Sequence, residues 1–129
     1  MTGAGPSTPS QRFRASQRVK RARDFRAARE HGRRTDCGAF QLVWSARPSP
    51  ADRAPARVGV VASKANIGNA VQRNRAKRRL RELFRKHQAA VPAGLDLILT
   101  ARPALLRLDY AEVEQRFLTA CRKLAPPHA

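Results

Sequence analysis

The residues with the clearest chemical capacity are cations, concentrated between Arg73 and Lys86. Six arginines and two lysines occur in this stretch, against a single acid, Glu82. Guanidinium and ammonium groups donate charged hydrogen bonds to anionic oxygens, so such a cluster is suited to binding phosphates. The whole chain of 129 residues has 27 Lys and Arg against 9 Asp and Glu, a formal net charge of +18. This balance indicates a nucleic acid or an anionic membrane as partner.

The spacing of these cations predicts an amphipathic helix with one apolar and one basic face. The apolar residues recur at helical spacing on the inner face, at Ala76, Leu80, Leu83, Phe84 and His87. The opposite face carries Asn74, Arg78, Arg81 and Arg85. Like charges at i,i+4 each cost about 0.2–0.5 kcal/mol, and bound phosphates would relieve that cost. A solvated basic face is the alternative, although solvated faces ordinarily interleave both signs of charge.

Groups that could catalyse a reaction are sparse by comparison. The acids closest in sequence belong to a helix cap or lie beside arginine, and His31, His87 and His128 are far apart. Ser63 has no activating partner nearby in the sequence. A hydrolase site built from protein side chains is therefore not expected. The small-residue segment 63–69 could bind phosphate at the start of the basic helix, or Gly68 could simply serve a tight turn.

The sequence argues against a membrane-spanning protein, a secreted protein and a disulfide-stabilised one. No apolar run approaches the ~20 residues of a membrane-spanning helix, and the first residues lack the apolar stretch of a secretory signal. Cys37 and Cys121 are too few for a disulfide framework, and we expect both to be small buried hydrophobes. These features favour a cytoplasmic protein with no membrane partner.

We expect a disordered basic tail at 1–15, a single domain with a polyanion as its partner at 16–125 and a C-terminal tail at 126–129. A short helix is expected from about Val19 to Glu30, and one or two strands over 33–46. A proline-rich loop at 47–56 would lead to a strand at 57–62, pairing antiparallel with the strand before it.

The second half of the domain contains an apolar strand and a final helix. Leu95–Ala101 reads as a central strand, and the Asp109 to Glu112 spacing is that of a capping box. The predicted order is helix, two or three strands, basic helix, strand and helix. The fold class is therefore α+β, a two-layer α/β sandwich.

The stretch 57–85, RVGVVASK…IGNAVQRNRAKRRLRELFR, resembles the signature of the bacterial ribonuclease P protein component. Arg73-Asn74-Arg75, followed by Lys77-Arg78 and Arg81-Glu82, is similar to the RNR motif of that family. Weaker agreement extends over roughly residues 18–124. It includes Arg23-Asp24-Phe25 before the basic stretch and Leu95–Ala101 after it.

The resemblance implies the fold of the second domain of ribosomal protein S5, with a left-handed β-α-β crossover that contains the RNR stretch. Pattern reasoning alone would not predict this hand, because about 98% of such crossovers are right-handed. The resemblance also implies a protein subunit, one per catalytic RNA, that assists removal of the 5′ leader from precursor tRNA. The RNA would perform the reaction with Mg²⁺, and the protein would bind no metal itself.

Site residues follow from the same resemblance. The RNA-binding positions are Arg73, Asn74, Arg75, Lys77, Arg78 and Arg81, and the helical wheel adds Arg85. A cleft for the leader, between the first helix and the sheet, would use Phe25, Ser63 and Lys64. From the residues alone, Phe25 could instead belong to the core. Arg29, Val43 and Ala65 stand where the family often has an aromatic residue, a tyrosine and a lysine, respectively.

Two other functions are compatible with the charge. A structural RNA-binding protein, for instance of the ribosome, would need the same basic surface and have no link to cleavage. A stand-alone nuclease would need catalytic side chains that the sequence does not bring together. Copurification with ribosomal subunits, or hydrolysis by RNA-free protein, would identify these cases.

Overall fold

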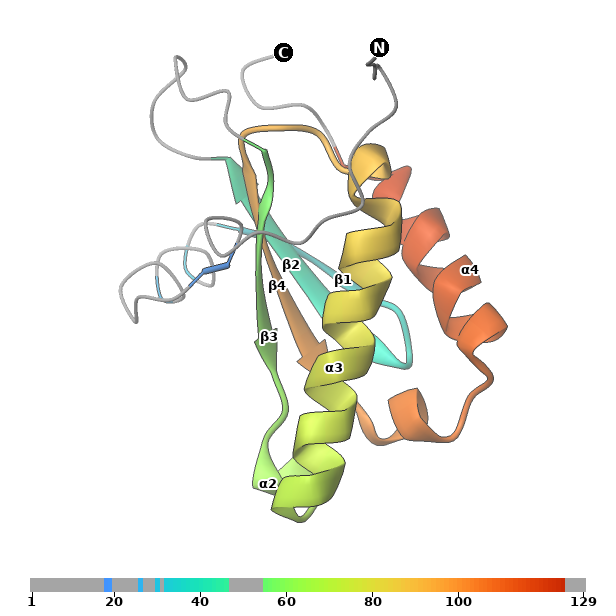
Figure 1. Ribbon diagram of the computed structural model, residues 1–129. Coiled ribbons are helices and arrows are strands. Elements are labelled where there is room, and N and C mark those ends of the chain that lie inside the picture. The colour runs from blue at the N-terminus through green and yellow to red at the C-terminus, as the bar shows by residue number, and fades with distance from the viewer. Residues whose placement is uncertain (1–17, 20–25, 27–29, 31, 47–54, 125–129) are drawn as a thin grey trace, which may run out of the picture.

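The computed structural model describes residues 18–19, 26, 30, 32–46 and 55–124 (Figure 1). The strands are β1 (Arg33–Asp36), β2 (Phe40–Ala46), β3 (Arg57–Val61) and β4 (Leu95–Ala101). The helices are α2 (Lys64–Ile67), α3 (Ala70–His87) and α4 (Tyr110–Cys121), with short 3₁₀ helices η2 (Gln88–Ala90) and η3 (Pro103–Leu106). Both predicted tails and most of the predicted first helix, including Phe25 and Arg29, lie outside the described residues.

The strands form a sheet in the order β1-β2-β4-β3. The expectation that β2 and β3 pair with each other is wrong, because β4 lies between them, antiparallel to β2 and parallel to β3. Six of the seven residues of β4 are buried, so this strand needs cover on both faces and a neighbour on each edge. An interior place satisfies both requirements, and it confirms that Leu95–Ala101 is a central strand.

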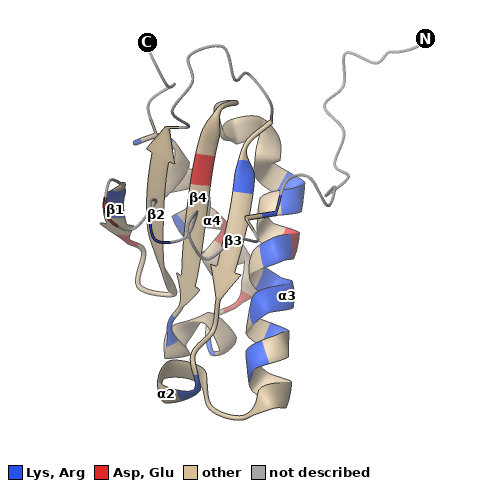
Figure 2. Ribbon diagram, turned by 90° about the vertical axis from the view of Figure 1, so that its left-hand side faces the viewer, with Lys and Arg blue, Asp and Glu red and all other residues tan. Residues whose placement is uncertain are grey.

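The predicted α+β two-layer class is confirmed. Helices α3 and α4 lie on one side of the sheet, and Figure 2 shows α4 behind it. The unit β3-α3-β4 joins two neighbouring parallel strands, so the basic helix lies within a β-α-β crossover as the resemblance implied. The left hand of that crossover stays a prediction.

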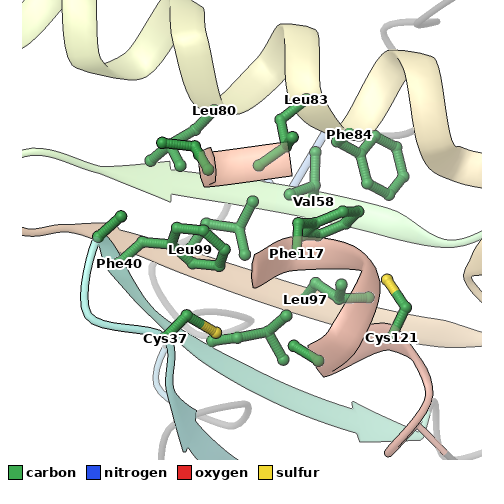
Figure 3. Close-up of a cluster of buried hydrophobic side chains, with 14 of the residues drawn as sticks. Cys37, Phe40, Val58, Leu80, Leu83, Phe84, Leu97, Leu99, Phe117 and Cys121 are labelled. Carbon is green, nitrogen blue, oxygen red and sulfur yellow. The ribbon is translucent and has the colours of Figure 1, made fainter. Parts of the chain in front are cut away.

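The main core lies between the sheet and the two long helices (Figure 3). Leu80 and Phe84 of α3, Phe117 of α4 and Leu97 of β4 have no exposed surface. The rings of Phe40 and Phe117 pack against each other in a tilted arrangement, with their centroids 6.2 Å apart. Burial of each such side chain contributes about 1.5–3 kcal/mol, so this cluster fixes α3 against the sheet.

Helix α4 begins at Tyr110, as predicted from the Asp109 cap, but the capping box is not formed. The Asp109 side chain makes no capping hydrogen bond. The carboxylate of Glu112 instead accepts a hydrogen bond from Nε of Arg116 at 2.9 Å, one turn further along the helix. An arginine at i+4 offers Glu112 a charged partner, which the capping box does not.

Cys37 and Cys121 are free and buried, as expected. Burial, as the largest cause, raises the pKa of the Cys37 thiol to about 11 and that of Cys121 to about 12. Folding therefore favours the neutral thiol. The corresponding stability is present below the ordinary pKa of 9.0 and is lost as the pH rises toward 11.

Because the thiolate is the reactive form, both thiols should resist alkylation in the native state. We expect iodoacetamide at pH 8 to label native protein at least about 100-fold more slowly than urea-unfolded protein. Mass spectrometry of labelled peptides would measure this for each cysteine separately. Equal rates in the two states would mean that the thiols are accessible and not buried.

Candidate nucleic-acid interface

The segment before α3, predicted to be a turn, contains the short helix α2 and two helix caps. Oγ of Ser63 accepts a hydrogen bond from the Asn66 amide at 3.1 Å and thereby caps the single-turn helix α2. Gly68 then takes φ 113°, a conformation that favours glycine, and Asn69 caps α3 by accepting from the Gln72 amide at 2.9 Å. Two successive caps therefore set where the basic helix begins.

The helical wheel predicted from the sequence is confirmed in α3. Ala76, Leu80, Leu83 and Phe84 are buried. The exposed positions among the predicted RNA-binding residues are Asn74, Arg75 and Arg78, while Arg73, Lys77, Arg81 and Arg85 are half-buried. Figure 2 shows the basic residues following α3 along its length. One helix face thus holds the core and the other presents a row of cations.

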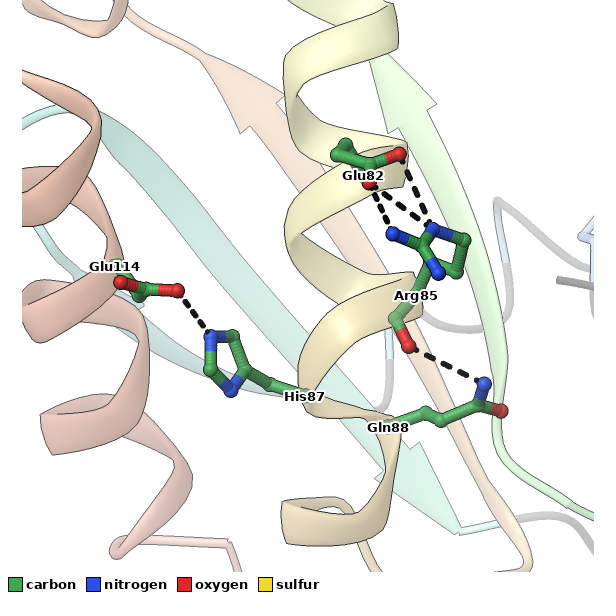
Figure 4. Close-up of polar contacts among 5 residues, drawn as sticks. All are labelled: Glu82, Arg85, His87, Gln88 and Glu114. Carbon is green, nitrogen blue, oxygen red and sulfur yellow. Dashed lines mark hydrogen bonds and ion pairs between the residues drawn. The ribbon is translucent and has the colours of Figure 1, made fainter. Parts of the chain in front are cut away.

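Glu82 neutralises one member of this row. Nε of Arg85 donates to both carboxylate oxygens of Glu82, at 3.0 and 3.2 Å, and a second guanidinium nitrogen makes an ion pair with the same group (Figure 4). The hydrogen bond from Arg85, more than any other cause, lowers the pKa of Glu82. Arg85 is therefore less available to an external anion than the sequence suggested.

The other cations of the row have no such partner in the described part of the chain. There, no carboxylate oxygen lies within 4.0 Å of the charged groups of Arg73, Arg75, Lys77, Arg78 or Arg81. Repulsion among them is therefore not offset by an ion pair with those acids. A polyanion would supply the missing counter-charge.

Arg79 and His87 join α3 to the neighbouring elements. One guanidinium nitrogen of Arg79 donates to the carbonyl oxygens of Leu105 and Leu108, the latter at 3.2 Å. Nε2 of His87 lies 2.7 Å from a carboxylate oxygen of Glu114 in α4 (Figure 4). His87 thus belongs to the contact between the two helices, in keeping with its predicted place on the inner face.

A hollow of about 380 Å³ lies along the cationic row. Its lining residues on α3 are Asn74, Arg78, Arg81, Glu82 and Arg85, and Arg18 contributes from the N-terminal segment. Sequence reasoning missed Arg18, because it belongs to no periodic segment that would mark its position. Its place next to α3 depends on pairing with a strand that is distant in the sequence.

The predicted leader-binding residues lie apart from this hollow, where the structure describes them. Ser63 and Lys64 are at α2, which Figure 1 places beside the N-terminal end of α3. Lys64 is exposed, whereas Ser63 is engaged as a cap. Val43 is only 2% exposed and packs with Val19 and Ile98 on the sheet face opposite the main core.

The sheet face that carries Val43 also holds an ion pair between its strands. Arg57 of β3 donates to both carboxylate oxygens of Asp96 in β4, at 2.8 and 2.6 Å. The two residues are direct neighbours across the parallel pair. This bidentate contact satisfies Asp96, which is 8% exposed, and so stabilises the pairing of β3 with β4.

The family model for ribonuclease P matches residues 13–125. The chain belongs to the ribonuclease P protein family. The ribonuclease P protein component of Thermobifida fusca is 38% identical over 114 residues, covering 85% of this chain and 77% of that protein. The one from Brevibacillus brevis is 36% identical over 118 residues, covering 88% of this chain and 90% of that protein.

Solved ribonuclease P proteins have the same fold. The Thermotoga maritima protein superposes with a TM-score of 0.70 at 25% identity, covering 84% of this chain and 97% of that one. A Staphylococcus aureus mutant described as defective in mRNA degradation activity gives a TM-score of 0.71 at 27% identity, covering 84% and 87%. The chain is thus the protein component of a ribonucleoprotein endonuclease of tRNA processing, with ribonuclease P RNA as its partner.

Neither a metal site nor a membrane-spanning helix is found within the described residues. No group of three or more His, Cys, Asp or Glu side chains there could hold a metal ion. None of the described helices is long and apolar enough to cross a membrane. Several described acids instead face cations, as Asp96 and Glu82 do.

Proposed function

We propose that this ribonuclease P protein binds the catalytic RNA through the outer face of α3, in a 1:1 complex in the cytoplasm. The observation that carries the proposal is the row of cations on α3, mounted on a packed inner face; apart from Arg85, these cations have no carboxylate within 4.0 Å among the described residues. Arg73, Asn74, Arg75, Lys77, Arg78 and Arg81 are the contact residues, and Arg85 contributes less because Glu82 holds it. Each phosphate neutralised contributes about 0.7–0.9 to the steepness of the salt dependence.

The second part of the proposal is that the protein holds the 5′ leader of precursor tRNA. Lys64 is exposed beside the start of α3, where its ammonium group can contact a leader phosphate. Ser63 sets the geometry of that turn as the cap of α2. The role of Phe25, as a ring stacked on a leader base, rests on the family resemblance.

The chemical step is assigned to the RNA and its Mg²⁺ ions. Mg²⁺ is bound in proteins mainly by carboxylate oxygens and water, and the described part of this chain does not assemble a suitable group of acids. The protein's own contribution is to neutralise phosphate repulsion between catalytic RNA and substrate. Leader removal at the precursor's 5′ end would then proceed at lower Mg²⁺ concentrations.

A reconstituted holoenzyme tests the proposal. Bacterial ribonuclease P RNA and precursor tRNA would be mixed at low Mg²⁺, with and without the protein, and release of the 5′ leader measured. We expect the protein to accelerate release, and to raise the affinity for precursor tRNA more than that for mature tRNA. Equal rates with and without protein would refute the proposal. An equal increase in affinity for precursor and mature tRNA would refute only the leader-binding part of the proposal.

A further inference from the structure

Arg79 lies on the edge of α3 that faces α4, away from the outer face of the helix. Helix residues follow one another at about 100°, so Arg79 is about 100° from Arg78 around the axis and about 160° from Arg81. Lys86 follows seven residues later, on the same edge, and its ammonium group lies 5.0 Å from the centre of the Tyr110 ring in α4. This edge of α3 therefore contacts the protein's own chain.

The guanidinium group of Arg79 satisfies two backbone carbonyl groups at the end of η3. One of its nitrogens donates to the carbonyl oxygens of Leu105 and Leu108, the latter at 3.2 Å. A short 3₁₀ helix leaves its last carbonyl groups without partners inside the helix. Leu105 has no exposed surface, so water does not supply the missing partner. Within the described residues, no other hydrogen bond to either carbonyl group is found.

This arrangement sets Arg79 apart from its neighbour in the sequence. A buried carbonyl group that loses its donor bears the full cost of its removal from water. An RNA phosphate could therefore recruit the Arg79 guanidinium only by breaking both bonds to η3. Arg78 is exposed, and its side chain makes no hydrogen bond or ion pair with the described residues.

We propose that Arg79 is a clamp that holds the connection from β4 to α4 against α3, and that it does not contact RNA in the holoenzyme. The part that concerns RNA rests on the proposed function. At its other end η3 is joined to the turn between β1 and β2, where the Arg102 amide donates to the Ala39 carbonyl at 3.0 Å. The arginine-rich stretch thus contains an arginine whose partner is the protein backbone.

Thermal unfolding of Arg79→Met tests the clamp, with Arg78→Met as the matched control one residue away. Methionine keeps an unbranched apolar stem and removes the charged donors. We expect Arg79→Met to lower the unfolding midpoint by at least about 4 °C, because the Leu105 carbonyl loses its partner. Arg78→Met should stay within about 2 °C of the wild type.

Amide hydrogen exchange adds a local readout of the clamp. The amides of Arg107 and Leu108 donate to the Ala104 carbonyl, so their exchange reports on the order of η3. In Arg79→Met this exchange should accelerate at least about tenfold more than that of the β4 amides, because the loss is confined to one segment. Equal acceleration in η3 and β4 would overturn the clamp.

RNA-binding titrations over a range of KCl concentrations test the second part, at a temperature where both variants are folded. Arg79→Met should keep the wild-type salt slope and an affinity within about twofold of the wild type. Arg78→Met should flatten the slope by about 0.7–0.9, because it loses a phosphate contact. Equal flattening in the two variants would show that Arg79 also contacts RNA, and would overturn this part.

The outcomes distinguish this inference from the proposed function. Wild-type protein that fails to bind ribonuclease P RNA would overturn the proposed function, whereas unfolding and hydrogen exchange judge the clamp without RNA. An Arg79→Met variant with the wild-type midpoint and wild-type exchange in η3 would overturn the clamp and leave the proposed function standing.

Discussion

The double variant Arg78→Ala, Arg81→Ala should bind ribonuclease P RNA far more weakly than the wild-type protein. A charged hydrogen bond is worth about 1.5–3 kcal/mol, so each lost contact corresponds to about 10- to 100-fold in affinity. The salt dependence should flatten as well, by about 0.7–0.9 for each phosphate contact removed. Filter binding or fluorescence titration across KCl concentrations would measure both quantities.

The fold of this double variant should remain intact, because both side chains lie on the outer face of α3 and away from the core. Circular dichroism and thermal unfolding would verify this, with Arg122→Ala as a variant that removes a single charge elsewhere. An unfolded spectrum would show that these residues stabilise the protein. An unchanged salt slope would show that their guanidinium groups do not contact phosphate.

Leu80→Ala should lower the stability of the protein without removing any of the proposed RNA-binding residues. Leu80 has no exposed surface and lies within the core under α3. Truncating such a leucine costs about 2–5 kcal/mol, through lost burial and the cavity that remains. That is a large part of the roughly 5–15 kcal/mol typical of a folded domain. Urea unfolding followed by circular dichroism would measure the difference.

Val71→Ala is the matched control for this substitution. Val71 is on the same helix and is 73% exposed. Its truncation should change the free energy of unfolding by less than about 0.5 kcal/mol. If Leu80→Ala were as mild as Val71→Ala, the inner face of α3 would not be packed as described.

Much of this architecture was predictable, because local periodicity reports burial directly. The alternation at Phe40, Leu42 and Trp44 and the helical spacing of Leu80, Leu83 and Phe84 both correspond to the observed core. The neighbour of β3 was not predictable in this way. Periodicity says which face of a strand is buried, whereas the order of strands depends on contacts between segments far apart in sequence, such as Val58 with Leu97.

The basic face was predictable as a set, but the state of each member was not. Counting charges could not reveal that Arg85 would pair with Glu82, or that Glu112 would bind Arg116 in place of forming a cap. Arg18 illustrates the same limit, since its position depends on a bridge to Val58. Side-chain partners at a surface are chosen among several of similar energy, so sequence spacing alone does not select them.

The insertion of β4 between β2 and β3 has a consequence for synthesis on the ribosome. Because β2 and β3 are not neighbours, a nascent chain that ends before Leu95 cannot close the sheet. Until β4 is made, the buried face of α3 cannot pack against Leu97 and Leu99, which belong to the same core. Folding must therefore await long-range contacts formed late in translation, which is typical of slowly folding topologies. The proposed RNA-binding surface is therefore completed only after β4 has been synthesised.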